Sequence, residues 1–287
     1  MSGPAIFDRK LLRTRQKRAR ALGPETFLID RVADELGERL SAVLRRFERA
    51  VDLGTPSDAV RRALVASGKV GTVFGADSVV SDEEALPFAD GSLDLMVSAL
   101  ALQFVNDLPG TLIQIRRALK PDGFLLAALI GGDSLTELRE AFTQSESEIE
   151  GGLSPRVAPF ADVSELGGLL QRAGFALPVV DSDRLTVRYP SVLALMRDLR
   201  RMGATNVMTE RRRLPLRRAT LQRMTEIYAQ RFADPDGRLR ATFEVVWLSG
   251  WAPHASQQKA LKPGAAAQRL ADALGAKEIS TGEKAGR

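Results

Sequence analysis

The 287-residue chain contains no cysteine and a single histidine, His254. Without cysteine it has no disulfides, thiolate metal ligands, iron–sulfur ligation or cysteine nucleophile of its own. One histidine cannot build a zinc site of several histidines, nor an iron site of two histidines and one carboxylate. We therefore expect no metal site within a single chain. The same absence constrains any oxidative chemistry that the chain could perform.

Long hydrophobic runs are also missing. No apolar run approaches the roughly 20 residues that span a bilayer, and the N-terminus lacks the apolar core of a secretory signal. The sequence therefore predicts no integral membrane segment, with the cytoplasm as the default location. A content of 44% hydrophobic and 27% charged residues is ordinary for a globular protein that buries a full core.

Positive charge is present in two clusters, although the formal net charge is only +5. Seven Lys or Arg residues lie between Arg9 and Arg20, and five lie between Arg211 and Arg218. Such clusters suit nucleic acid, an anionic membrane face or a protein partner, or they are solvated helix faces. We expect solvated faces and no nucleic-acid partner, with peripheral membrane contact left open.

The most informative stretch covers residues 82–133. An apolar run at 93–102 has the length of a strand, residues 107–119 have a helical pattern, and a second apolar run follows at 124–130. Asp107 is a suitable helix cap and Pro109 suits the first helical turn. The pattern therefore predicts a strand, a helix and a second strand.

Two nearly continuous apolar strands joined by a crossover helix indicate a parallel sheet that is covered on both faces. Ligands of such sheets bind beyond the carboxyl ends of the strands. The residues that follow the two strands, Ser98, Ala99 and 131–133, are therefore candidates for a site.

Within this stretch the sequences DEEALPF, LDLMVSAL and LKPDG resemble the acidic loop, fourth strand and fifth strand of class I S-adenosylmethionine-dependent methyltransferases. The further runs GGDSLTELR, EGGLSPRVAPFADV, LLQRAGF and DGRLRATFEVVWLSGW resemble one subgroup. It comprises bacterial relatives of the mitochondrial complex I assembly factor described as an arginine hydroxylase, often labelled as malonyl-carrier-protein methyltransferases. The similarity extends from about residue 6 to 251.

The resemblance implies an α/β fold with a Rossmann-like, seven-stranded sheet whose last strand is antiparallel. We expect N-terminal helices at 1–48, a methyltransferase-like domain at 49–189 and 238–253, a helical lid at 190–237, and a flexible tail at 254–287. The lid is inserted between strands six and seven, where a hairpin would need only a few residues. Tyr189, Arg197, Asn206 and Tyr228 are candidate linings of a substrate site.

The resemblance also implies S-adenosyl-L-methionine as the cofactor and assigns residues to it. These are Asp52, Leu53, Gly54, Asp77, Asp82, Glu83, Ser98 and Ala99. By resemblance, Asp82 accepts the adenine amino group. Asp77 stands where acidic residues bind ribose hydroxyls in nucleotide folds, with a turn residue as the alternative. Thr55-Pro56-Ser57 replaces glycines that the family carries after Gly54, which crowds the turn.

Three residues are candidates for catalysis, each with a simpler alternative. Gln103 replaces a histidine of relatives and can position a substrate but cannot titrate near neutrality; a solvated helix start is its alternative. Asp133 follows the second strand and is otherwise a helix cap. Arg156, in a loop with two prolines, suits an acidic group of substrate or cofactor.

Several functions follow from the resemblance. The first is an enzyme of this fold that modifies a protein, with the iron–sulfur subunit of respiratory complex I as the expected partner, by methylation or arginine hydroxylation. The second is a non-catalytic assembly chaperone with a decayed cofactor pocket, which the replaced glycines favour. The third is a malonyl-carrier-protein O-methyltransferase of biotin synthesis, with Arg211 to Arg218 facing the carrier.

Overall fold

The computed structural model describes residues 5–75, 82–257 and 275. The chain divides into two compact units, Met1–Pro253 and His254–Arg287. In the second unit, Nδ1 of His254 lies 2.7 Å from Oγ of Ser256, and the helix expected at 265–274 lies outside the described residues.

The helices and strands of the first unit alternate along the chain. In order they are α1 Arg9–Ala21, α2 Phe27–Ser41, β1 Phe47–Asp52, α3 Ala59–Ala66, β2 Val70–Phe74, β3 Leu93–Ala99, the short 3-10 helix η1 Leu102–Phe104, α4 Leu108–Ala118, β4 Leu119–Ile130, α5 Thr136–Glu150, α6 Val163–Arg172, β5 Ala176–Tyr189, α7 Val192–Arg201, α8 Arg218–Phe232 and β6 Leu239–Trp251.

The described strands form one sheet in the order β2-β1-β3-β4-β6-β5. The first four are parallel, and β6 is antiparallel to both β4 and β5. The α/β fold and the antiparallel last strand are confirmed. The sheet of the described residues has six strands where seven were expected, and the connection from β2 to β3 runs through residues 76–81, which are not described.

The alternation of polar and apolar residues in β6 suits an antiparallel edge partner of the preceding strand. β6 is an antiparallel partner of β5, but it lies between β4 and β5, and β5 forms the edge. The reason is the run from Val245 to Leu248, whose side chains are all buried and therefore require cover on both faces of the sheet.

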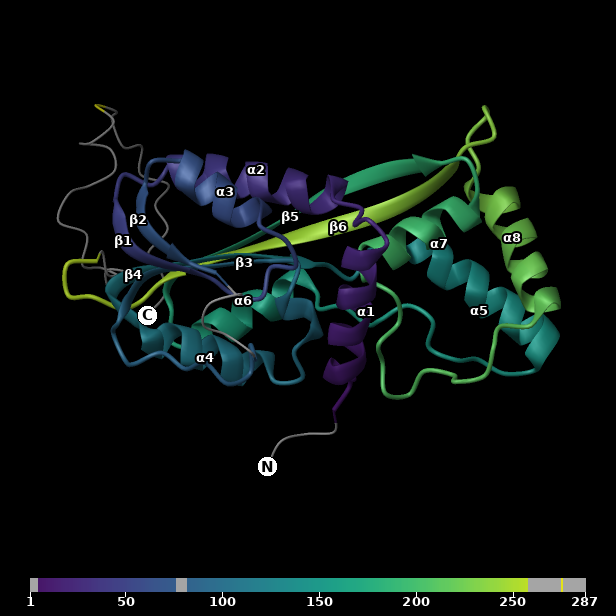
Figure 1. Ribbon diagram of the computed structural model, residues 1–287, viewed down its shortest axis with the longest axis horizontal. Helices are drawn as coiled ribbons and strands as arrows, with labels where there is room; N and C mark the ends of the chain where they lie inside the picture. The colour runs from purple at the N-terminus through teal and green to yellow at the C-terminus, as the bar shows by residue number, and fades with distance from the viewer. Residues whose placement is uncertain (1–4, 76–81, 258–274, 276–287) are drawn as a thin grey trace, which may run out of the picture. The chain divides into compact units, whose positions relative to one another are not determined.

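Helices cover both faces of the sheet (Figure 1). α2 and α3 lie over one face, and α4 and α6 lie over the other. Each face has its own buried apolar cluster, with Leu36, Val60 and Leu95 in one and Met96, Ile115 and Leu170 in the other. The alternation of Leu95 and Met96 follows from the period of two in a strand.

The crossover helix α4 confirms its expected start. The side chain of Asp107 accepts a hydrogen bond from the backbone N–H of Gly110 at 2.8 Å, and Pro109 lies in the first turn. The helix ends at Ala118 and the chain enters β4 at once, five residues before the expected strand. Lys120 holds this early part of β4 by an ion pair to Asp94 at 2.9 Å.

The N-terminal segment is tied to the insertion between β5 and β6. The backbone N–H of Asp8 donates to the carbonyl of Val207 at 2.8 Å, and that of Thr209 donates to the carbonyl of Ile6 at 2.9 Å. Phe7 also packs edge-on against Phe104, with ring centroids 5.8 Å apart. α1 is thereby fixed beside α7 at one end of the strands (Figure 1). Within the described residues, no helix has both the length and the apolar character needed to span a membrane.

Candidate functional site at the carboxyl edge of the sheet

The turn after β1 holds the first expected cofactor residues. Asp52 ends the strand and is buried, and Gly54 adopts a left-handed backbone with φ of +72°. A side chain there would strike Glu83, because a Cβ on Gly54 would lie 2.5 Å from Oε1 of Glu83. The hydroxyl of Thr55 donates to Asp52 and accepts from the backbone N–H of Ala99 at 3.1 Å. Thr55 therefore ties the tips of β1 and β3 together, which a glycine could not do.

The other strand-end residues are buried at the ends of β1 and β3. Oγ of Ser98 donates to the carbonyl of Leu53 at 2.8 Å, and the N–H of Leu53 donates to the carbonyl of Val97 at 2.8 Å. The side chains of Leu53, Ser98 and Ala99 are fully buried. These residues thus join the two strand ends, and none of them is among the residues that line the cavity at Gln103. Asp77 lies outside the described residues.

The acidic residues at 82–84 all contact one arginine of α1. The guanidinium of Arg9 lies 3.1 Å from Asp82 and 3.4 Å from Glu84, and it donates a hydrogen bond to Glu83. Arg13 adds a contact to Asp82 at 3.4 Å. The Arg9 side chain is only 13% exposed, so these pairs are partly shielded from water. A ligand that uses these carboxylates must share them with Arg9 or displace it.

Gln103 occupies the bend after β3. Leu100 has φ of +54°, which turns the chain into η1 and brings Gln103 back over the strand end. The side-chain N–H of Gln103 donates to the carbonyl of Leu100 at 2.8 Å, while its side-chain oxygen is buried with no partner among the described residues. A buried acceptor without a donor indicates a position where a ligand or water donates.

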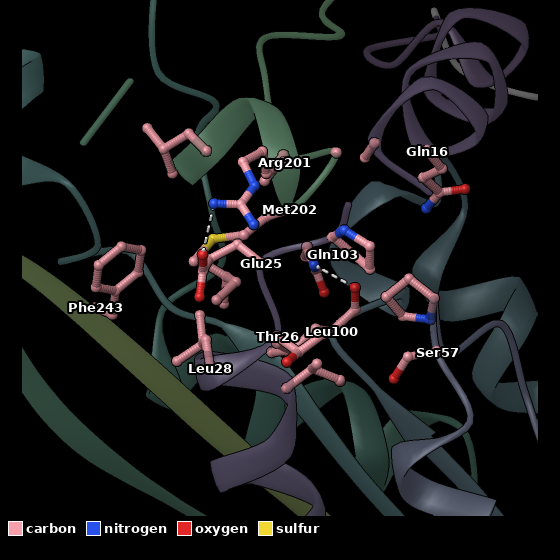
Figure 2. A pocket seen from close by; sticks show the side chains of 18 of the residues that line it. Gln16, Glu25, Thr26, Leu28, Ser57, Leu100, Gln103, Arg201, Met202 and Phe243 are labelled. Carbon is pink, nitrogen blue, oxygen red and sulfur yellow. Dashed lines mark hydrogen bonds and ion pairs between the residues drawn. The ribbon is translucent and has the colours of Figure 1, made fainter. Parts of the chain in front are cut away.

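A cavity of about 110 Å³ lies where these tips meet the N-terminal helices and α7. Its walls are mainly apolar, with polar groups at a few points. Its lining includes Gln16, Arg20, Glu25, Leu28, Ser57, Leu100, Gln103, Phe104, Arg201, Met202 and Phe243. Figure 2 shows Leu28 and Phe243 on one side of the cavity and Ser57 on the other, with Gln103 between them.

One ion pair crosses the rim of the cavity. A terminal nitrogen of Arg201 lies 3.2 Å from Oε2 of Glu25, and Nε of Arg201 donates to the carbonyl of Gly23 at 2.7 Å. The pair joins the end of α7 to the link between α1 and α2 (Figure 2). The carboxylate of Glu25 therefore already holds a guanidinium at the cavity.

Asp133 lies apart from this cavity. Its carboxylate is half exposed and pairs with Arg184 of β5. The expectation that Asp133 caps the following helix is wrong, because α5 begins at Thr136 after Leu135, whose φ is +55°. The reason is that Oε2 of Glu244 accepts the backbone N–H of Asp133 at 2.9 Å, which holds the chain in a turn.

Packing within the protein leaves no room for a side chain at Gly131. A Cβ on Gly131 would lie 2.4 Å from Oε2 of the buried Glu244. The close approach expected for a ligand at this glycine is thus made by a side chain of β6.

Arg156 forms an ion pair with the buried carboxylate of Glu146. It donates from Nε to Glu146 at 2.7 Å, and its guanidinium lies 5.5 Å from the ring centroid of Phe142. Burial alone would raise the pKa of Glu146, but hydrogen bonds from Ser154 and Arg156 outweigh it and lower the pKa. Arg156 does not line the cavity, so it fastens the loop that follows α5.

The structure also brings residues to the site that no sequence pattern had singled out. These are Arg9 on the acidic residues, Glu25 with Arg201 at the rim, and Met202 in the wall. Arg9 was visible only as one member of a basic cluster. The lining proposed from the insertion is also different, because Tyr189 and Tyr228 are buried in the core. No group of three or more metal-ligating side chains occurs among the described residues.

Together the strand order, the glycine turn after β1 and the acidic residues at the carboxyl edge define the class I methyltransferase fold. A family model described as a methyltransferase domain matches residues 37–127. Two crystal structures support the fold, protein YcgJ from Bacillus subtilis and protein BH2331 from Bacillus halodurans. Each has a TM-score of 0.51 and covers 77% of this chain, at 16% and 15% identity, with 98% and 99% of the respective structure covered.

Curated relatives define the family more narrowly. The arginine-hydroxylase NDUFAF5 of Danio rerio is 36% identical over 94% of this chain and 90% of that protein, and the human protein is 39% identical over 91% and 81%. The malonyl-[acyl-carrier protein] O-methyltransferase of Laribacter hongkongensis is 41% identical, over 65% of this chain and 60% of that protein. The chain belongs to the family of the arginine-hydroxylase NDUFAF5 proteins, enzymes with a methyltransferase-like fold.

Proposed function

We propose that the protein binds S-adenosyl-L-methionine and modifies a subunit of respiratory complex I during assembly, by methylation or arginine hydroxylation. The iron–sulfur subunit is the proposed substrate. The observation that carries this proposal is the cavity at the strand tips, which combines apolar walls with the carboxylate of Glu25 and the unpartnered oxygen of Gln103. The guanidinium of Arg201 lies against Glu25, so a cationic substrate side chain would share this carboxylate with Arg201 or displace it.

The residues at the tips of β1 and β3 fit the proposed cofactor in their types. Asp52 and Gly54 form the turn at the tip of β1, and Asp82 and Glu83 supply carboxylates that accept hydrogen bonds from hydroxyl and amino groups. Ser98 and Ala99 are buried at the end of β3. When bound, S-adenosylmethionine supplies an electrophilic methyl group on a sulfonium. The residues of the chain contribute positioning and exclusion of water, which is most of what such a transfer asks of a protein.

Calorimetry with S-adenosylmethionine tests the first part of the proposal. We expect saturable binding to the full chain, and no heat and no thermal shift would refute it. Mass spectrometry of the complex I subunit from a deletion strain tests the second part. Loss of a mass equal to one oxygen atom supports hydroxylation, and loss of one methylene supports methylation. An unchanged subunit mass would refute both.

A non-catalytic chaperone is the second candidate, because other side chains of the protein already contact the expected cofactor residues. Thr55 bridges the tips of β1 and β3, Glu83 covers Gly54, and Arg9 holds the acidic residues. This candidate predicts that a deletion strain loses assembled complex I although the subunit carries no modification in the wild type.

A malonyl-carrier-protein O-methyltransferase is the third candidate. Arg20 and Arg201 at the cavity offer cations to a substrate carboxylate, and relatives with that name cover about two thirds of the chain. Biotin auxotrophy of the deletion strain would support this candidate, and growth without biotin would remove it.

A further inference from the structure

The basic helix α1 carries more cations than the structure uses. Seven of its thirteen residues are Lys or Arg, and none is acidic. Arg9 and Arg13 pair with the acidic residues at 82–84, and Arg15 donates to the carbonyl of Asn206. The remaining four, Lys10, Lys17, Arg18 and Arg20, have no carboxylate partner among the described residues.

Three of these four cations share one side of the helix. At about 100° per residue, Lys10, Lys17 and Arg20 fall within an arc of about 80°. All three are exposed, and we call them the α1 stripe. The stripe is about 15 Å long, because ten residues of helix rise by 1.5 Å each.

The stripe is continuous with the cavity. Arg20 lines the cavity, as does Gln16 one turn before it, so one end of the stripe lies at the entrance. Figure 2 shows Gln16 of α1 among the lining side chains, across from Arg201 of α7. Gly203 packs directly against this part of α1, since a Cβ at Gly203 would lie 3.2 Å from Cα of Gln16.

The apolar side of α1 is occupied by the protein. Leu12 is buried, and Leu11 packs with it against the cluster that contains Phe7 and Met208. A helix that lies in a membrane interface needs a free apolar face in addition to its charges. The helix itself offers only its charged side, which suits an extended acidic chain better than a lipid surface.

From this geometry we propose that the α1 stripe binds an acidic segment of the protein substrate that flanks the residue in the cavity. The inference rests on the proposed function, because it assumes that a substrate side chain enters beside Arg20. An extended chain covers about 3.3 Å per residue, so the stripe spans four or five residues. The substrate should therefore carry acidic side chains within about five residues of the modified position.

Two fluorescein-labelled peptides of sequence Gly-Arg-Gly-Asp-Glu-Asp-Glu and Gly-Arg-Gly-Asn-Gln-Asn-Gln test the proposal with the full chain. We expect fluorescence anisotropy at low salt to give about tenfold tighter binding of the acidic peptide, the sum of three exposed ion pairs of usual strength. The preference should shrink at about 0.15 M salt, where exposed charges are screened. Equal binding of the two peptides would overturn the proposal.

Charge-reversal variants locate the effect. Lys10→Glu, Lys17→Glu and Arg20→Glu together should abolish the preference for the acidic peptide. The matched control reverses Arg46, Arg61 and Arg172, which are exposed outside α1 and change the net charge equally. An equal loss in the control would mean that net charge, not the stripe, attracts the peptide, and the proposal would fall.

Two further measurements distinguish peptide binding by the stripe from membrane binding and from cofactor binding. Sedimentation with vesicles of phosphatidylserine and phosphatidylcholine in equal parts tests a membrane role. Vesicle binding that the stripe variant loses, without any peptide preference in the wild type, would replace the proposal by a membrane surface. Calorimetry with S-adenosylmethionine reports the proposed function separately. Cofactor binding without a preference for the acidic peptide refutes only the proposed role of the α1 stripe. A preference for the acidic peptide without cofactor binding refutes only the proposed enzymatic function.

Discussion

Replacing Gly54 by alanine tests the link between the turn after β1 and the acidic residues. Two costs arise in this variant. A non-glycine residue at φ of +72° loses about 1–2 kcal/mol. The added Cβ would also lie 2.5 Å from Oε1 of Glu83 and 3.1 Å from Cβ of Ala101, so Glu83 must move away from Arg9. Losing that charged hydrogen bond costs about 1.5 kcal/mol.

We therefore expect Gly54→Ala to lower the free energy of unfolding by about 3 kcal/mol. Gly68→Ala is the matched control, because Gly68 has φ of +63° and nothing within 4 Å of its would-be Cβ. The control should pay only the backbone cost of about 1–2 kcal/mol. Urea denaturation followed by circular dichroism measures both values.

A double-mutant cycle isolates the contact with Glu83. In a Glu83→Ala background, Gly54→Ala should cost little more than Gly68→Ala, because the clash with Glu83 is gone and only the backbone cost and the 3.1 Å contact with Cβ of Ala101 remain. If Gly54→Ala lowers the free energy of unfolding no more than Gly68→Ala does in the wild-type background, the close approach of Glu83 to Gly54 does not affect stability. If the Glu83→Ala background leaves the excess unchanged, the reasoning about Glu83 is wrong.

Three further predictions concern ion pairs of the site and its surroundings. Arg9→Met should lower the free energy of unfolding by about 1.5–3 kcal/mol. The same variant should bind S-adenosylmethionine about threefold to tenfold more tightly in calorimetry, because the cofactor need no longer break an ion pair of Arg9. Weaker binding would show that Arg9 belongs to the ligand site. Glu25→Gln should lower kcat/KM on an arginine peptide by about tenfold to a hundredfold, and an unchanged value would exclude Glu25 as the cation receptor. Because the pKa of Glu146 is lowered, its stabilisation is complete above the unfolded-state pKa of about 4.3 and is lost as the pH falls through the folded-state pKa. Glu146→Gln should therefore cost about 1.5–3 kcal/mol at pH 7 and converge with the wild type in acid, whereas a pH-independent difference would contradict the role given to the pair with Arg156.

Local patterns predicted much of the fold because they act over short distances. Asp107 and Pro109 mark the start of α4, and its apolar stripe repeats at helical spacing within this one short segment. The buried strands β3 and β4 were equally plain, since continuous apolar runs allow few alternatives. The boundaries were less accurate, as at Leu119, where the chain passes from helix to strand without a loop.

The sequence could not predict which side chains pair when they lie far apart in the chain. The acidic residues at 82–84 were recognised, but their partner Arg9 lies more than seventy residues earlier in the chain. Arg156 was a candidate for substrate binding because its buried partner Glu146 is not distinguishable in sequence from the other acidic residues of α5. Asp133 has the composition of a cap, yet the backbone turn imposed by Glu244 places Leu135 there instead.

The interior place of β6 also bears on how the protein is made. This strand is synthesised after every other strand of the first unit, yet it pairs with β4 on one side and β5 on the other. Until residues 239–251 leave the ribosome, the apolar flank of β4 is an open edge that can recruit other chains. Translation that halts within α8 should therefore yield a nascent chain that aggregates through the unpaired edge of β4.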